Sequence, residues 1–243
     1  MRDELSLKPC ESGFSLLELI IAMAITVTIT ALAGNLLAES MKIRTRANDK
    51  VDALADAQRA LNIMSREIAD AGFNLSDNGI VAADSVTDAN GNSTIRIRSN
   101  LNKFNLSAST AAQNGIGDPG ALPGEDAGED VKYFIYLVPG TTNLLARYDA
   151  NNVAGGSSTV LANRLDSLHI HYFAQSVTYN TTGCDISGAS AAEVGPAAAT
   201  YVVIAVCVAQ DAVGAPGSPG YQPATNVLLV SDVALRNSNL PIY

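Results

Sequence analysis

An apolar run near the N-terminus constrains the fold of this chain more than any other feature. Between Phe14 and Leu37 the only charged residue is Glu18. An α-helix needs ~20 apolar residues to cross the hydrocarbon layer of a bilayer. A carboxylate in that layer costs on the order of 2.5 to 3.5 kcal/mol on insertion scales, so it usually has a partner and a function. The sequence therefore predicts a transmembrane segment over residues 14–37 and marks Glu18 as a candidate functional residue.

The segment before the apolar run is short and polar. Residues 1–13 read MRDELSLKPCESG, contain the helix-breaking Pro9 and end with Gly13. A secretory signal peptide has its cleavage site after its apolar region. Here the candidate processing site, the junction between Gly13 and Phe14, comes before that region. We therefore expect residues 1–13 to be a leader peptide that is removed.

This junction resembles the class III signal of type IV prepilins and type II secretion pseudopilins, in which a glycine is followed by Phe, three residues and Glu. Gly13, Phe14 and Glu18 match that pattern without a gap. The resemblance implies that a prepilin peptidase cleaves between Gly13 and Phe14 on the cytoplasmic side of the membrane and methylates the new amine of Phe14. It also implies that Glu18 attracts the N-terminal amine of a neighbouring subunit during filament assembly. An ordinary membrane anchor gains nothing from that glutamate.

The helical pattern continues beyond the bilayer-length segment. Apolar residues recur at or near seven-residue intervals, at Ala47, Val51, Leu54, Leu61, Met64 and Ile68. Gly72 is a helix stop signal. Residues 14–72 are therefore predicted to form one helix, ~88 Å long at 1.5 Å per residue, whose outer half packs on the rest of the chain.

After residue 72 the pattern changes to the alternation typical of strands. Candidate strands are Ser93–Arg98, Val131–Val138, Leu144–Tyr148, Arg164–Ala174, Thr200–Ala209 and Asn226–Arg236. Long loops rich in Ala, Gly and Pro lie between them, at residues 107–128, 185–199 and 211–224. The sequence thus predicts an α+β fold, in which the long N-terminal helix packs on an antiparallel β-sheet head domain formed by residues 73–243.

Three stretches of the head are similar to the sheet strands of W-type minor pilins and J-type minor pseudopilins: VKYFIYLVPGTTNLLARYD, VLANRLDSLHIHYF and VLLVSDVALRN. In those families a strand pair leads to a leucine and an arginine, here Leu145 and Arg147. A late strand closes with Arg-Asn, here Arg236 and Asn237. The resemblance implies a minor type IV pilin subunit that acts in initiation or near the filament tip, with a J-type pseudopilin of type II secretion as the alternative.

The same resemblance implies where the protein resides and what it meets. Its partners would be prepilin peptidase, other minor and major pilins or pseudopilins, and the inner membrane. The head would lie in the periplasm, and later on a cell-surface pilus or a periplasmic pseudopilus. The basic residues Lys42, Arg44 and Arg46 follow the span, and by the positive-inside rule they favour the opposite orientation. We give the cleavage motif more weight than this charge count.

The cysteines give an independent indication of compartment. Of the three, Cys10 lies in the leader, which leaves Cys184 and Cys207 after cleavage. A periplasmic or surface-exposed head permits a disulfide between them. The alternative is two unpaired cysteines in the core.

Charge and motif searches argue against other functions. Residues 73–243 carry seven Lys/Arg against fourteen Asp/Glu, which disfavours binding of nucleic acid by the isolated head. No serine-based triad or phosphate-binding glycine loop is present, so we expect no catalytic residue, no cofactor and no enzyme activity. A signal-anchored periplasmic enzyme or binding protein remains the third reading.

Two motifs suggest metal ions only weakly. His169 and His171 are two residues apart on a candidate strand and therefore face the same side, but no nearby Cys or paired carboxylate completes a site. Residues 88–92, DANGN, resemble part of a calcium loop, yet Asn90 and Asn92 stand where acids are needed. A turn before the first strand explains that segment better. We therefore expect no metal site.

Overall fold

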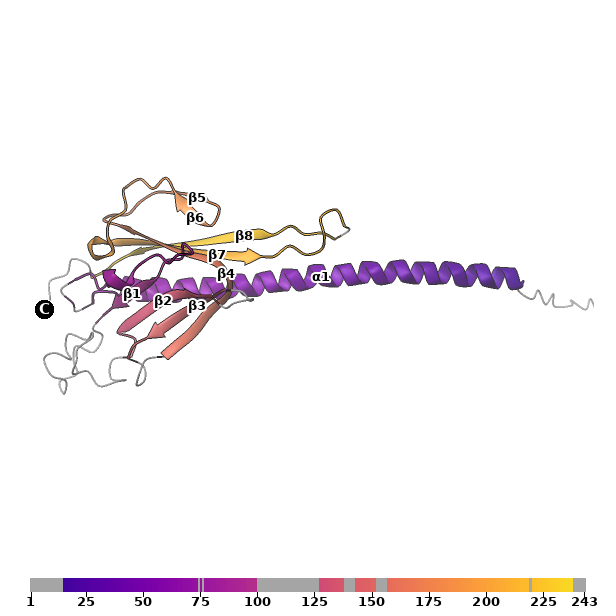
Figure 1. The fold of residues 1–243 in the computed structure, drawn as a ribbon, viewed down its shortest axis with the longest axis horizontal. Coiled ribbons are helices and arrows are strands. Elements are labelled where there is room, and N and C mark those ends of the chain that lie inside the picture. The colour runs from indigo at the N-terminus through magenta and orange to yellow at the C-terminus, as the bar shows by residue number, and fades with distance from the viewer. Residues whose placement is uncertain are drawn as a thin grey trace, which may run out of the picture.

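The computed structural model describes residues 15–73, 75, 77–99, 127–137, 143–151, 157–218 and 220–237. The leader, Gly13, Phe14 and almost all of the predicted loop 107–128 lie outside these residues. One long helix extends from a β-rich head, so the molecule has the shape of a rod with a globular end (Figure 1). The predicted α+β architecture is confirmed.

The helix α1 (Leu16–Ala69) contains 54 residues and is ~81 Å long at 1.5 Å per residue. It ends three residues before the predicted stop at Gly72. That glycine has a φ of 75°, and its N–H donates to the carbonyl oxygen of Arg98 at 2.8 Å instead of continuing the helix. At the predicted stop residue, Gly72, the chain has therefore already left the helix and entered the head.

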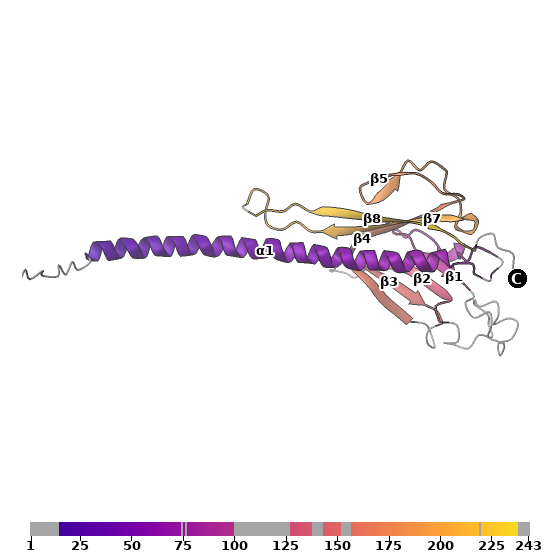
Figure 2. The same ribbon diagram turned by 180° about the vertical axis from the view of Figure 1, so that it is seen from behind.

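Only the C-terminal half of α1 packs on the head (Figure 2). Its buried residues are Ala53, Ala57, Ala60, Leu61, Met64, Ile68 and Ala69. The predicted apolar stripe is right for Leu61, Met64 and Ile68 but wrong for Ala47 and Val51, which are exposed, Val51 by 64%. The small side chains of the alanines let the helix backbone come close to the sheet, so this part of the contact face lies one or two residues from the predicted stripe.

Six antiparallel strands form the main sheet, in the order β1-β2-β3-β4-β7-β8. Their bounds are β1 (Ile95–Arg98), β2 (Asp130–Tyr136), β3 (Asn143–Asp149), β4 (Ser157–Phe173), β7 (Tyr201–Gln210) and β8 (Thr225–Ala234). A separate hairpin joins β5 (Asn180–Thr182) and β6 (Asp185–Ser187), and two 3-10 helices are η1 (Ala82–Asp84) and η3 (Pro196–Ala198). Each predicted strand overlaps one strand of the main sheet, whereas the short, solvent-accessible β5 and β6 were missed.

The long strand β4 connects two parts of the sheet. Its residues 157–165 pair with β3, and its residues 165–173 pair with β7. At the change of partner Arg164 has a φ of 58°, in the left-handed region, and the register shifts on both sides. Both views show β1–β3 on one side of α1 and β7–β8 on the other (Figures 1 and 2). Because β4 bends, a single sheet packs around the C-terminal end of the helix.

Candidate processing and assembly site

Glu18 lies in the first turn of α1, and its side chain is exposed. The backbone N–H of Ser15 donates to Glu18 Oε2 at 3.3 Å, which is the reciprocal half of a capping box. Gly13 and Phe14 lie outside the described residues, so the structure places Glu18 but not the junction that precedes it. The carboxylate is therefore located at the start of the helix, in the same region as the predicted cleavage site.

The N-terminal half of α1 is uncovered and apolar. An 18-residue window of this helix has a mean hydropathy of 2.3, and none of that window is buried in the structure, so by length and composition the helix can cross a membrane. The hydroxyls of Thr26, Thr28 and Thr30 donate to the carbonyl oxygens of Ala22, Ala24 and Thr26, at 2.7, 2.6 and 2.8 Å. The polar atoms of these threonines are thus satisfied within the helix, as a hydrocarbon environment requires.

This half of the helix carries a known sequence signature. Residues 8–34 match the prokaryotic N-terminal methylation motif. The methylation motif is the class III prepilin signal, and it includes Gly13, Phe14 and Glu18. With the uncovered apolar helix it fits a membrane-anchored, type IV pilin-like protein. No curated protein and no solved structure matches this chain.

The methylation motif does not extend into the head, where two of the links to the helix involve residues singled out in the sequence, and the first of these is Arg147. From β3 its Nε lies 3.0 Å from Glu67 Oε2 and 3.2 Å from Oε1, and Glu67 belongs to α1. The buried Tyr133 hydroxyl on β2 donates to the same carboxylate. Burial, and then the Glu67 carboxylate, raise the pKa of Tyr133 far above its ordinary value. Arg147, which the sequence linked to minor pilins, thus connects the sheet to the helix.

The second link holds the end of α1. The backbone N–H of Arg236 donates to the carbonyl oxygen of Ala69 at 3.2 Å, and the Asn237 side-chain amide donates to the carbonyl oxygens of Asp70 and Ala71, both at 3.3 Å. Carbonyls at a helix C-terminus lack partners within the helix, so these donors cap it. The Arg-Asn pair recognised in the sequence therefore has a structural role here.

Sequence reasoning missed Glu67. The sequence places Glu67 on the charged face of the predicted helix, outside the apolar stripe, so no local signal marked it. Finding its partner Arg147 required the sheet, since the two residues are 80 positions apart.

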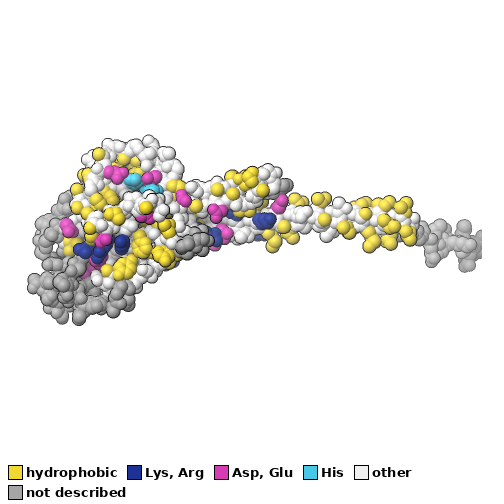
Figure 3. Space-filling model, viewed as in Figure 1, with side chains coloured by type: hydrophobic (Ala, Val, Ile, Leu, Met, Phe, Trp, Pro, Cys, Tyr) yellow, Lys and Arg dark blue, Asp and Glu magenta, His cyan; other side chains and the backbone are white. Residues whose placement is uncertain are grey.

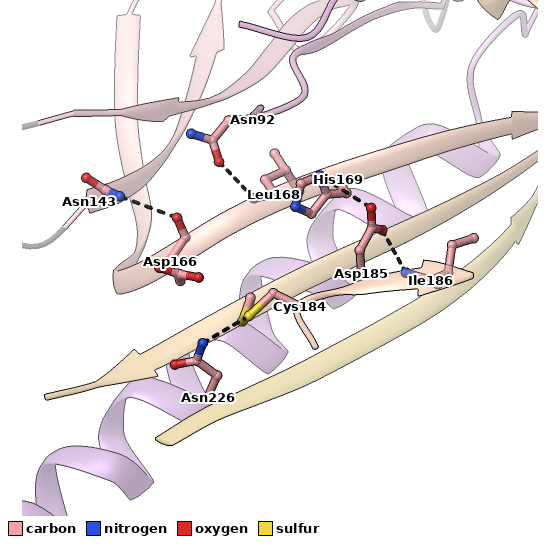
Figure 4. The surroundings of a disulfide bond; sticks show 10 residues. Asn92, Asn143, Asp166, Leu168, His169, Cys184, Asp185, Ile186 and Asn226 are labelled. Atoms are coloured by element: carbon pink, nitrogen blue, oxygen red, sulfur yellow. Dashed lines mark hydrogen bonds and ion pairs between the residues drawn. A yellow bond between two sulfur atoms is a disulfide. The ribbon is translucent and has the colours of Figure 1, made fainter. Parts of the chain in front are cut away.

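Cys184 and Cys207 form a disulfide, with their Cα atoms 5.2 Å apart (Figure 4). Cys184 lies between β5 and β6, whereas Cys207 is fully buried in β7, so the bond fastens the small hairpin to the main sheet. The side-chain amide of Asn226 on β8 donates to Cys184 Sγ at 3.2 Å. Among the described residues, one group of potential ligand atoms is close enough for a metal ion, Asp166 with these two cysteines, but the disulfide occupies both sulfurs.

We predict that this disulfide forms in the exported protein. It closes a loop of residues 184–207, and the chain-entropy relation gives a stabilisation of about 3 kcal/mol. Peptide mapping without reductant should recover the two cysteines in one linked peptide. Protein matured in the periplasm with two free thiols would contradict the prediction.

The two histidines lie on one face of β4, and the structure corrects the view that no carboxylates are near them. His171 Nε2 is 2.7 Å from Asp185 Oδ1, and His171 Nδ1 is 2.8 Å from Glu193 Oε1. His169 Nδ1 is 3.7 Å from Asp185 Oδ2. The sequence hid these partners because they come from β6 and the segment after it, which fold back onto β4. Both ring nitrogens of His171 are thus within hydrogen-bond distance of a carboxylate, and these contacts hold the segment on the sheet.

The DANGN segment forms the predicted turn. Asp88 Oδ1 accepts hydrogen bonds from the backbone N–H groups of Asn90 and Asn92, both at 2.8 Å. Asn92 Oδ1 in turn accepts from the backbone N–H of Leu168 on β4 at 3.3 Å. These contacts are those of an Asx-type turn docked on the sheet.

Proposed function

We propose that this chain is a minor subunit of a type IV pilin-like filament and acts in initiation of assembly or near the tip. One observation carries the filament role: the methylation motif lies on the half of α1 that the head leaves uncovered. An exposed apolar helix of this kind is unfavourable in water, so it needs an apolar environment. In this proposal lipid provides that environment first, and the helices of neighbouring subunits provide it in the filament. In this proposal residues 1–13 are removed as the leader, residues 14–37 span the inner membrane, and residues 73–243 form the periplasmic head.

The proposed role of Glu18 follows from the cost of a charge in lipid. After cleavage between Gly13 and Phe14, the Phe14 amine and the Glu18 carboxylate of different subunits have opposite charge. Pairing them in the filament core offsets the unfavourable burial of both. A subunit drawn from the bilayer would thereby enter the filament in register. The N-methyl group that the motif implies would be carried by the same amine.

The minor role rests on the form of the head. A shaft subunit repeats at every lattice position, so its surface must fit copies of itself many times. Here the β5–β6 hairpin stands apart from the main sheet, and the end of the β7–β8 hairpin extends beyond the other strands along α1 (Figure 1). Such projections are easier to accommodate where neighbours are few and different. These features support a place at the start or the tip of a filament.

A J-type minor pseudopilin of type II secretion is the second candidate. The similarity around Leu145, Arg147, Arg236 and Asn237 favours it as much as it favours W-type pilins, because in this chain these residues hold the sheet on the helix and serve either filament. The genes that neighbour this one distinguish the two systems, since pilus genes indicate the first and secretion genes the second.

We predict that the mature protein begins at Phe14. Only the Gly13–Phe14 junction presents the motif at the membrane edge, so co-expression with a prepilin peptidase should remove residues 1–13 and add one methyl group. Intact-mass measurement of the purified protein gives the result directly. A mass that retains residues 2–13 would refute the processing step.

We predict that the subunit is scarce in filaments. A protein confined to initiation or the tip occurs in a few copies, whereas a shaft protein repeats along the whole length. Quantitative mass spectrometry of sheared filaments measures this ratio against the most abundant pilin. Equal amounts of the two would make this chain a shaft subunit.

A further inference from the structure

The β7–β8 hairpin runs along α1 toward the uncovered half of the helix (Figures 1 and 2). Val213 and Gln222 exchange two backbone hydrogen bonds of 2.9 Å and close a tip, which we define as residues 213–218 and 220–222. A Cβ atom placed on Gly220 would lie 3.5 Å from the carboxyl carbon of Glu39. Since Glu39 comes two residues after Leu37, the hairpin tip lies level with the end of the apolar run.

The length of the helix places this level in a bilayer. From Leu16 to Leu37 the helix measures ~33 Å, close to the ~30 Å of the hydrocarbon core. Each headgroup layer adds about 5 to 7 Å beyond that core. Glu39 lies ~3 Å past Leu37 along the helix axis. When α1 spans the membrane, the hairpin tip therefore lies within the headgroup layer.

The chemistry of the hairpin tip suits that layer. No residue from Ala212 to Ala224 is charged. Ala215 and Pro216 are exposed in the tip, and hydrophobic side chains gather on this part of the hairpin (Figure 3). Tyr221 is half-buried at the same level, and tyrosine is enriched at membrane interfaces.

The adjoining turns of α1 supply positive charge. Lys42 and Arg44 are exposed on the helix just beyond Glu39. Arg46 fixes the hairpin, because its guanidinium donates to Gln222 Oε1 at 3.0 Å and to the carbonyl oxygen of Pro223 at 2.6 Å. Between helix and hairpin lies a groove of about 560 Å³, lined by apolar residues such as Met41 and Val213 and by charged residues of both signs. The cations are Lys42, Arg46 and Arg164, and the carboxylates are Asp49 and Asp211. The cations outnumber the carboxylates, which suits the phosphate of a phospholipid headgroup.

We propose that the hairpin tip and the basic turns of α1 beside it bind the headgroup layer of a phospholipid bilayer, and that they bind anionic headgroups most strongly. The head is then seated on the membrane at a second point besides the span, which fixes its orientation before assembly. Basic residues near an anionic surface are attracted to it over about a Debye length. The proposal rests on the membrane insertion of α1 that the proposed function also requires.

The chain contains no tryptophan, so a single introduced indole reports its own surroundings. We suggest the full chain with Tyr221→Trp, reconstituted in phosphatidylcholine vesicles that carry a spin label on the headgroup. Phe73→Trp is the matched control, because Phe73 is 41% exposed and lies just past Ala69, about 45 Å along the helix from Glu39. The spin label should quench most of the tryptophan fluorescence of the Tyr221→Trp protein. It should leave the tryptophan fluorescence of the Phe73→Trp protein unchanged.

Three further arms make the outcomes distinct. Ala215→Trp, at an exposed position, repeats the measurement if Tyr221→Trp disturbs the fold. Phosphatidylglycerol in the vesicles should increase quenching at position 221, and Lys42→Gln should reduce that increase. Leu32→Trp with a label deep in the acyl chains tests insertion itself. Quenching at position 32 without quenching at position 221 or 215 would overturn the proposal and indicate that the hairpin tip contacts a neighbouring protein instead. Absence of quenching at position 32 would overturn membrane insertion of α1, and the proposed function with it.

Discussion

Replacing Glu18 by alanine or by glutamine is expected to exclude the protein from filaments while leaving it in the membrane. Removal of a charge from the apolar half of α1 favours partitioning into lipid, so insertion should not suffer. If pairing with a neighbouring amine offsets ~2.5 kcal/mol of burial cost, its loss corresponds to a decrease on the order of fifty-fold in incorporation. Shearing of filaments, followed by immunoblotting of the filament and membrane fractions, measures both quantities.

The glutamine variant separates the two roles that the structure allows for this residue. Glu18 also accepts a hydrogen bond from the Ser15 backbone, and glutamine serves equally in a capping box. Glu18→Gln therefore keeps the helix cap and removes the charge, whereas Glu18→Ala removes both. Loss of incorporation in both variants supports the charge pair. Normal incorporation of Glu18→Gln would reduce Glu18 to a capping residue.

A matched control guards against a general effect of charge. Asp52→Asn removes an exposed carboxylate from the same helix, in the half that packs on the head. This variant should enter filaments as the unmodified protein does. A comparable loss in the Glu18 and Asp52 variants would show that net charge, not the position of Glu18, controls assembly.

The sequence was sufficient to predict the long helix and the six main strands, because both have strong local periodicity. It could not locate the contact face of α1 correctly, since Ala53, Ala57 and Ala60 carry little hydropathic signal and are buried only because the sheet comes close to them. The N-terminal part of β4 was missed for a related reason. Its polar start at Ser157 and Ser158 hides the strand, which exists because β3 pairs with it.

The N-terminal site could be predicted from the sequence because its motif is contiguous. The contacts of the head could not, because they join segments that are distant in the sequence. Arg147 and Glu67 are 80 positions apart, and His171 and Glu193 are 22 apart with a reversal of the chain between them. Nothing in the local sequence around either member specifies its partner. Such pairs become visible only when the sheet order is known.

Arg96→Met is expected to cost the head about 3 kcal/mol of unfolding free energy. The guanidinium of Arg96 on β1 donates to both carboxylate oxygens of Asp130 at 2.7 Å, and to Asp84 Oδ2 at 2.6 Å. The side chain of Asp130 is only 3% exposed, so without Arg96 its charge is left in a poorly solvated site. Methionine keeps the length and the apolar stem of the side chain, which confines the change to the lost charge. Urea unfolding of the full chain in detergent, followed by near-ultraviolet circular dichroism, measures the difference.

Arg236→Met is the matched control. Its guanidinium lies 3.4 Å from Asp70, but the two side chains are 70% and 46% exposed. Exposed ion pairs contribute about 0 to 1 kcal/mol, so this variant should unfold close to the unmodified protein. Equal losses for the two arginines would show that the burial of Asp130 does not determine the effect.

Lowering the pH provides an independent check on the same cluster. The hydrogen bond from Arg96 is the main cause that lowers the pKa of Asp84 below its ordinary value of 3.8. A carboxylate whose pKa is lower in the folded state than in the unfolded state stabilises the fold fully at a pH above the unfolded-state pKa. That stabilisation is lost as the pH falls through the lowered, folded-state pKa. The unmodified protein should therefore lose stability below about pH 4, while Arg96→Met, in which Asp84 has already lost this partner, should lose less. The gap in unfolding free energy between the two proteins should narrow as the solution is acidified, and a constant gap would place the stabilising effect of Arg96 outside its contact with Asp84.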